Sequence, residues 1–224
     1  MAKTKHFGAL PTAAAALVAA ALLVLVLVVV NPQTAEAALP GDNGRIAYSG
    51  WDGNDWEIFT IGATGGLSSQ LTFNNTTDEL PCYSPDGFRI GYLGFLATNN
   101  SHQIFTIPTT GGSRVQVTPN TAEPLHCSFT GPRGSEIVYS GFDGLDFDIY
   151  TISASGGTPT QLTFNNISEV HPVYSPNGQR IAYSASDGTF MDSEIYTIPA
   201  TGGTPFQVTN NTTEDSDPSW QPRP

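Results

Sequence analysis

The feature that most constrains the fold is a unit of about 45 residues that occurs four times. Pairs of adjacent glycines mark the unit, and successive pairs are 46, 45 and 46 residues apart. The pairs are Gly65-Gly66, Gly111-Gly112, Gly156-Gly157 and Gly202-Gly203. A segment of the type Ile-aromatic-Thr-Ile recurs at the same steps, beginning at Ile58, Ile104, Ile149 and Ile195. Such self-similarity predicts an array of like supersecondary units.

Each unit contains the pattern of four short strands. Apolar residues alternate with polar ones, as in residues 45–49 and 180–184, and turn signals such as Ser-Pro-Asp-Gly, Asp-Gly and Gly-Gly separate the runs. In the second unit we expect strands at 80–84, 89–93, 103–107 and 115–118. Four antiparallel strands in a period of this length are typical of a propeller blade. A β-solenoid or a sandwich is the alternative, although solenoid periods are shorter and sandwiches rarely repeat internally.

The two ends of the repeat region complement each other. The units run over 44–79, 80–125, 126–170 and 171–216, and the first begins at Arg45 with what is the second strand of the others. The segment Asp217-Pro218-Ser219-Trp220 matches the missing first strand. We therefore expect an all-β propeller domain at 44–224 with four four-stranded blades, closed by a C-terminal strand at 217–221 that completes the first blade. Closure within one chain gives a monomer, and the alternative is a dimer that completes an eight-blade ring.

The first 37 residues have a different composition. Lys3, Lys5 and His6 form a basic start, residues 13–30 are entirely Ala, Leu and Val, and Ala35-Glu36-Ala37 offers the small residues of a cleavage site. This pattern predicts a signal peptide, with a retained membrane anchor as the alternative because the apolar run approaches the length that spans a bilayer. Residues 38–43 would be a short linker. We expect an exported protein, periplasmic or extracellular, that meets the membrane only through this segment if it is uncleaved.

Several of these motifs resemble a known family. Residues 83–90, 174–183 and the Ile-aromatic-Thr-Ile segments followed by Gly-Gly and Gln-Leu-Thr are similar to the WD-like propeller repeats of the TolB type, and the likeness extends over 44–220. The third unit departs at 129–134, where an extra Gly stands and Arg replaces Asp. The resemblance implies a propeller, but it implies no single activity. Such repeats occur in periplasmic partner-binding proteins, in prolyl-peptidase-like enzymes and in some polysaccharide lyases.

One position of the predicted first strand could build a site. Three residues before the aromatic of that strand stand Leu80, His126, His171 and Asp217. If the repeats are equivalent, His126, His171 and Asp217 converge near one end of the central channel. Two imidazoles and a carboxylate could bind a polar ligand or a divalent metal. Residues that cap turns and meet solvent are the alternative interpretation.

The Asp-Gly loops form a second constellation. Their carboxylates are Asp52, Asp55 and Glu57, then Asp143, Asp146 and Asp148, then Asp187, Asp192 and Glu194. Oxygen donors at this spacing could gather around a calcium ion, although the full spacing of a known calcium loop is missing. Carboxylates that accept backbone hydrogen bonds in turns are the alternative. We therefore expect no required cofactor, with a divalent metal such as calcium as a hypothesis.

The two cysteines lie in the first strands of consecutive units. Cys82 is one residue before its aromatic and Cys127 is two before, so the side chains point to opposite faces of their own blades. The two cysteine side chains could therefore point into the same gap between adjacent blades. A disulfide Cys82–Cys127 or two buried thiols both fit this arrangement.

Charge and composition narrow the function. The chain carries a formal net charge of −12, which disfavours binding to nucleic acid or to anionic lipid. There is no Gly-x-Ser-x-Gly motif and no glycine-rich phosphate loop, and only His102, His126 and His171 follow residue 37. We therefore identify no catalytic residues. The sequence favours a non-enzymatic module that binds a protein partner or a small ligand through its loop face or channel mouth. A metal-dependent lyase or hydrolase is the alternative.

Overall fold

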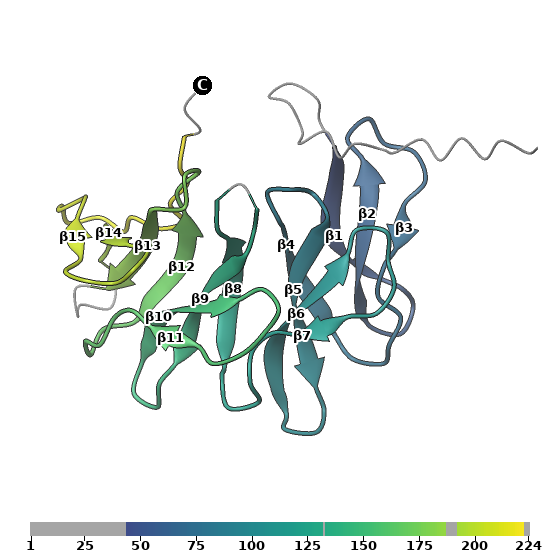
Figure 1. Ribbon diagram of the computed structural model, residues 1–224, viewed down its shortest axis with the longest axis horizontal. Helices are drawn as coiled ribbons and strands as arrows, with labels where there is room; N and C mark the ends of the chain where they lie inside the picture. The colour runs from purple at the N-terminus through teal and green to yellow at the C-terminus, as the bar shows by residue number, and fades with distance from the viewer. Residues whose placement is uncertain (1–43, 132, 187–191, 222–224) are drawn as a thin grey trace, which may run out of the picture. The chain divides into compact units, whose positions relative to one another are not determined.

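Fifteen strands in four antiparallel sheets make up the part of the chain that the computed structural model describes, residues 44–131, 133–186 and 192–221 (Figure 1). The first sheet consists of β1 (Arg45–Trp51), β2 (Trp56–Gly62) and β3 (Ser69–Gln70). The second consists of β4 (Asp78–Tyr83), β5 (Arg89–Leu96), β6 (Ser101–Pro108) and β7 (Val115–Gln116). The third consists of β8 (Pro124–Phe129), β9 (Glu136–Phe142), β10 (Phe147–Ser153) and β11 (Thr160–Gln161). The fourth consists of β12 (Glu169–Tyr174), β13 (Arg180–Ser186), β14 (Ser193–Pro199) and β15 (Phe206–Gln207).

The repeated sequence therefore folds into repeated blades, numbered here one to four in chain order. Each sheet follows the order of the chain, so that every strand pairs with its sequence neighbours. The second unit was predicted to contain strands at 80–84, 89–93, 103–107 and 115–118, and strands β4 to β7 lie there with slightly different bounds. No helix is present among the described residues, and hence none there could cross a membrane.

An aromatic pair links the second and third strands of every blade. Tyr92 faces Phe105 across β5 and β6, and their rings stack with centroids 5.8 Å apart. The same pairing occurs in the other three blades: Tyr48–Phe59, Tyr139–Tyr150 and Tyr183–Tyr196. Cross-strand aromatic pairs stabilise a sheet by about 0.5–1 kcal/mol each. The tyrosines of the motif thus act in sheet packing.

The hydrophobic core lies between consecutive blades. One cluster joins Ile58 of blade one to Ile90 and Tyr92 of blade two, and the next joins Leu93 of blade two to Tyr139 of blade three. A third cluster, which includes Val138 and Ile181, joins blades three and four. The apolar side chains of the two middle sheets therefore contribute to two different interfaces, because alternate residues of a strand point to opposite faces.

The outer faces of the two end blades differ from these interfaces. Ile46 of β1 is 53% exposed, whereas its equivalents Ile90, Ile137 and Ile181 are fully buried. In blade four, Val208 is equally exposed, although the corresponding residues of the other blades are buried. Each end blade thus presents an exposed apolar face. In the other blades, the equivalent residues are covered by the neighbouring blade, whereas no described residue covers Ile46 or Val208 in this way.

The expected closure is not observed. The first sheet has three strands, and among the described residues no strand pairs with the outer edge of β1. The segment 217–221 lies instead beside β12, where Trp220 Nε1 donates a hydrogen bond to the carbonyl oxygen of Val173 at 3.1 Å and Asp217 contacts His171. These contacts place it next to the first strand of blade four, and the sequence match between the two ends does not by itself bring them together.

Candidate functional site

The first strand of each complete blade carries a β-bulge at the same position in the repeat. The pairing of β4, β8 and β12 with the following strand shifts between Glu79 and Cys82, between Leu125 and Ser128, and between Val170 and Val173. Within the bulges, Leu80, His126 and His171 have φ values of 53°, 56° and 54°. Asp217 has the same conformation, with φ 53°. This left-handed conformation costs a residue other than glycine roughly 1–2 kcal/mol, and bulges re-aim side chains next to functional sites.

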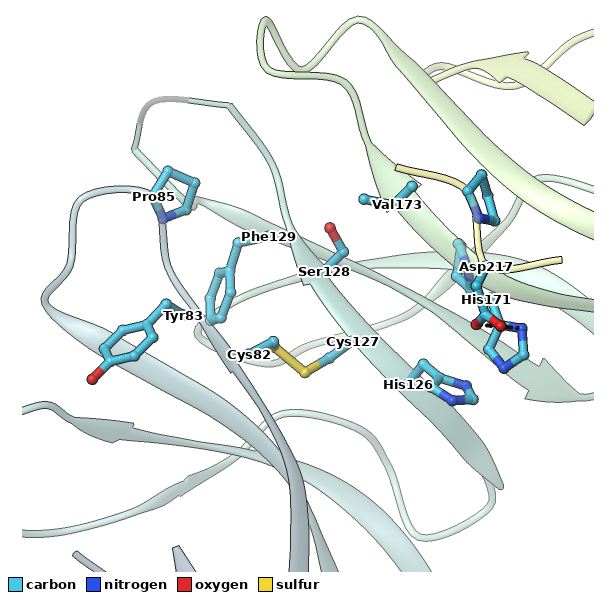
Figure 2. A pocket seen from close by; sticks show the side chains of 12 residues that line it. Cys82, Tyr83, Pro85, His126, Cys127, Ser128, Phe129, His171, Val173 and Asp217 are labelled. Atoms are coloured by element: carbon cyan, nitrogen blue, oxygen red, sulfur yellow. Dashed lines mark ion pairs between the residues drawn. A yellow bond between two sulfur atoms is a disulfide. The ribbon is translucent and has the colours of Figure 1, made fainter. Parts of the chain in front are cut away.

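Three of these re-aimed side chains meet in one cleft (Figure 2). The rings of His126 and His171 lie edge to face with centroids 4.2 Å apart, and His171 Nδ1 is 3.2 Å from Asp217 Oδ1. The cleft has a volume of about 440 Å³ and opens between first strands. Its lining residues are Cys82, Tyr83, Pro85, His126, Cys127, Ser128, Phe129, His171, Pro172, Val173, Asp217 and Pro218. Polar groups thus stand beside apolar side chains in one hollow, as in many ligand sites.

The protonation of His126 follows from its surroundings. Burial lowers the pKa of His126 below its usual value, the neighbouring His171 lowers it further, and Asp217 acts in the opposite direction. Its Nδ1 is buried and has no hydrogen-bond partner among the described residues. At neutral pH the imidazole of His126 is therefore uncharged, so a ring nitrogen can accept a hydrogen bond or bind a metal.

A disulfide lines the cleft together with Phe129. Cys82 of β4 and Cys127 of β8 are bonded, with their Cα atoms 6.1 Å apart, so the bond joins blades two and three. Gly91 of β5 leaves room for it, because a Cβ at that position would lie 2.9 Å from Cys82 Sγ. Both cysteines also line the cleft.

Comparison with known proteins decides the family. The sequence model of the protein family called TolB beta propeller domain matches residues 33–223. The chain belongs to this family. A TolB homologue from Chlorobium luteolum is 26% identical over 127 residues, which is 57% of this chain but only 28% of that protein. The matched region is thus less than a third of that relative.

Solved structures show the same fold as this TolB-family chain. The putative TolB from Agrobacterium tumefaciens superposes with a TM-score of 0.68 at 18% identity, covering 78% of this chain and 65% of that one. An oligogalacturonate lyase in complex with manganese superposes with a TM-score of 0.60 at 13% identity, covering 74% and 49%. At these identities the likeness concerns the fold, which both binding proteins and enzymes use.

The carboxylates of the Asp-Gly loops gather in two of the blades of this TolB-family propeller. Asp52, Asp55 and Glu57 each offer an oxygen within 4.8 Å of the others. In blade three, Asp143, Asp146 and Asp148 do the same. In blade four, Asp187 lies outside the described residues, whereas Asp192 is half-buried beside the buried Glu194. Among the described residues, His126, His171 and Asp217 do not form so close a group of donor atoms.

Sequence reasoning missed one buried carboxylate. Asp78 of β4 is fully buried, accepts a hydrogen bond from Asn74 Nδ2 at 2.7 Å and lies 3.7 Å from Arg114. Burial, together with the nearby Glu57, raises its pKa to about 7, although Asn74 and Arg114 act in the opposite direction. The recurrence of an Asn four residues before an acid, as in Asn165 and Glu169, was the available signal.

Proposed function

We propose that this chain is an exported binding module that holds a segment of a protein partner in the cleft of His126, His171 and Asp217. The observation that carries the proposal is the left-handed backbone at all three positions. A side chain at that conformation is unfavourable for folding, whereas a glycine would avoid the cost. Residues that persist in a strained conformation and converge on one hollow are typical of binding sites.

The lining of the cleft fits a peptide. Apolar surface from Phe129, Val173 and the disulfide lies next to two imidazoles and a carboxylate. An uncharged His126 can accept a hydrogen bond from a backbone N–H, and Asp217, whose side chain is 73% exposed, can attract a basic side chain. The acidic character of the whole chain would favour the approach of a basic partner.

A peptide selection tests this function. A displayed random peptide library would be selected on the purified protein and counter-selected on the His126→Ala, His171→Ala double variant. We expect the enriched peptides to bind the unchanged protein at least about tenfold more tightly than the double variant. His102→Ala is the matched control, because His102 packs against Phe95 and does not line the cleft. Peptides that bind all three proteins equally, or no enrichment at all, would refute the proposal.

A second candidate function uses the same residues as metal ligands in a lyase or hydrolase. The uncharged His126 and the contact between His171 and Asp217 favour it, and the similar lyase structure was solved with manganese. Titration of the protein with Mn²⁺, followed by electron paramagnetic resonance, would detect such a site. The enzyme would be favoured if His126→Ala loses the signal of bound Mn²⁺ and the unchanged protein releases unsaturated products from polygalacturonate. If the protein binds no Mn²⁺, the peptide-binding function is favoured.

Export is part of the proposal, and the segment that would direct it, residues 1–37, lies outside the described residues. Mass spectrometry of the protein recovered from its native host tests it. An N-terminus at Ala38 would indicate cleavage after Ala37 and support export. An intact N-terminus in the membrane fraction would indicate an anchored protein, and one in the soluble cell fraction would contradict export.

A further inference from the structure

Two hairpin loops bring three carboxylates together in the same way. Cluster one consists of Asp52, Asp55 and Glu57 around the β1–β2 loop, and cluster three consists of Asp143, Asp146 and Asp148 around the β9–β10 loop. In each loop the first Asp closes the turn with its own backbone: its N–H donates to the carbonyl oxygen three residues later at 3.1 Å. The two clusters are therefore copies of one local structure.

The middle carboxylate of each cluster is buried and has no hydrogen-bond partner in the described part of the chain. Asp55 is 8% exposed and Asp146 is 9% exposed, and neither oxygen of either side chain has a hydrogen-bond partner among the described residues. The first carboxylates differ in this respect: Asp52 Oδ1 accepts hydrogen bonds from the N–H groups of Asn54 and Asp55. Burial of an unpartnered carboxylate costs several kcal/mol unless a cation offsets its charge.

Blade two shows that the hairpin does not need these acids. At the positions of Asp55 and Glu57, this blade has Ser101 and Gln103. Gln103 Nε2 donates to Ser101 Oγ at 2.9 Å, so the neutral pair satisfies itself. In blade one, the same two positions hold two buried acids. Glu57 accepts hydrogen bonds from the backbone N–H and the side chain of Asn74, whereas neither oxygen of Asp55 has a partner among the described residues. Asp55 is thus not explained by the folding of the hairpin.

Among the residues that the structure describes, no positive side chain forms an ion pair with either cluster. The ion pairs among the described residues are Arg114 with Asp78 and His171 with Asp217, and neither includes a cluster residue. In cluster three, burial raises the pKa of Asp146, and Asp143 raises it further. Burial likewise raises the pKa of Asp148 to about 6. The charges of each cluster repel each other, and no positive side chain of the described part of the chain pairs with them.

We propose that cluster one and cluster three are calcium-binding sites. All the side-chain donors are oxygens, which are the ligands that Ca²⁺ prefers. Structural zinc sites use nitrogen and sulfur ligands instead, so these clusters do not fit structural zinc. The exposed Asp52 and Asp143 stand at the entrance, so an ion can reach the buried Asp55 and Asp146 from solvent. Loop carbonyl oxygens and water would complete the six to eight ligands of Ca²⁺. Mg²⁺ fits less well because it requires a stricter octahedron.

Calorimetric titration of the purified, chelator-treated protein with Ca²⁺ tests the proposal. We expect two sites with dissociation constants on the order of 10⁻⁴–10⁻³ M, as in extracellular calcium modules. Asp55→Ser with Glu57→Gln copies the neutral pair of blade two and should abolish one site. Asp146→Ser with Asp148→Gln should abolish the other. Because blade two already folds with Ser101 and Gln103, these variants keep a hairpin that the chain itself uses.

Terbium luminescence provides an independent measurement for cluster one. Trp51 and Trp56 flank its loop with their rings 6.1 Å apart, so excited indole can transfer energy to bound Tb³⁺. The signal should disappear in the Asp55→Ser, Glu57→Gln variant and persist in Glu136→Gln, which removes an exposed acid outside both clusters. Absence of Ca²⁺ binding at millimolar concentration, or binding that all variants retain, would overturn the proposal.

Discussion

Ile46 and Ile181 occupy the same position in the second strands of blades one and four, yet Ile46 is 53% exposed and Ile181 is fully buried. Ile181 packs between blades three and four, whereas Ile46 faces away from the interface between blades one and two. We expect Ile181→Ala to lower the free energy of unfolding by about 2–5 kcal/mol and Ile46→Ala by less than about 1 kcal/mol. Urea denaturation of both variants measures the difference.

The outcome also reports on closure of the ring. If a closing strand or a second chain covers β1 in solution, Ile46 becomes buried and its substitution becomes as costly as that of Ile181. Equal losses in the two variants would therefore contradict the exposed end blade. Light scattering on the same samples would separate closure within one chain from association of two.

The disulfide predicts a redox-dependent stability. Replacing Cys82 and Cys127 by serine should lower the free energy of unfolding by about 2–4 kcal/mol, because the bond closes a loop of 45 residues in the unfolded chain. Thermal denaturation with and without reductant measures the effect. Reductant should destabilise the unchanged protein by a similar amount and leave the serine variant unaffected. A reductant effect on both proteins would show another cause.

Glu169 predicts a dependence of stability on pH. Its pKa is raised from 4.5 to about 7, mainly by burial and also by the nearby Asp148, although hydrogen bonds from Thr163 and Asn165 act in the opposite direction. A carboxyl group whose pKa is raised on folding holds its proton in the folded state, so its contribution to stability decreases as pH rises from 4.5 to 7. Glu169→Gln should therefore match the unchanged protein at acidic pH and exceed it by on the order of 2–3 kcal/mol above pH 7.

Denaturation in urea across this pH range, in the presence of a chelator, measures the difference for Glu169→Gln. The variant keeps an oxygen to accept the 2.6 Å hydrogen bond from Asn165 Nδ2. Glu136→Gln, at an exposed position, is the control and should follow the unchanged protein at every pH. A constant offset between Glu169→Gln and the unchanged protein would rule out titration as the cause.

At the residues with left-handed backbone, we expect a substitution by glycine to stabilise the protein. Leu80→Gly should raise the free energy of unfolding by about 0.5–1 kcal/mol, because glycine adopts a φ of 53° without strain. Leu145→Gly, at an exposed residue that lacks this conformation, should lower it. His126→Gly should likewise be more stable than the unchanged protein while it loses peptide binding. Urea denaturation measures the first effect, and a loss of stability in Leu80→Gly would contradict it.

Much of the fold can be predicted from the sequence because the same pattern of strands and turns occurs in four units. The alternation of Ile90 and Tyr92, and the turns between the runs, predict the strands and their order within a blade. Contacts between the two ends of the repeat region are not predictable in this way. Sequence similarity shows that 217–221 resembles a first strand, but it does not show which sheet edge the segment contacts. The structure places it beside β12.

The candidate sites were predictable to a lesser degree. Equivalent positions in the repeat identified His126, His171 and Asp217, since equivalent residues recur at equivalent places. Asp55 and Asp146, in contrast, have no hydrogen-bond partner among the residues described, and this depends on how deeply each side chain is buried. A spacing of acids in a turn carries no such information. The repeat aligns Ser101 and Gln103 with the acids, but it does not reveal the hydrogen bond between these two side chains.

The bond between Cys82 and Cys127 also governs what happens if the backbone is cut. The chain between them contains β5, β6 and β7, with the exposed hairpin loop near Asn100. A protease that cleaves anywhere in this stretch leaves two polypeptides that the sulfur atoms still hold together. In an oxidising compartment, the nicked molecule would therefore retain its full mass, and only a reducing gel would reveal the damage.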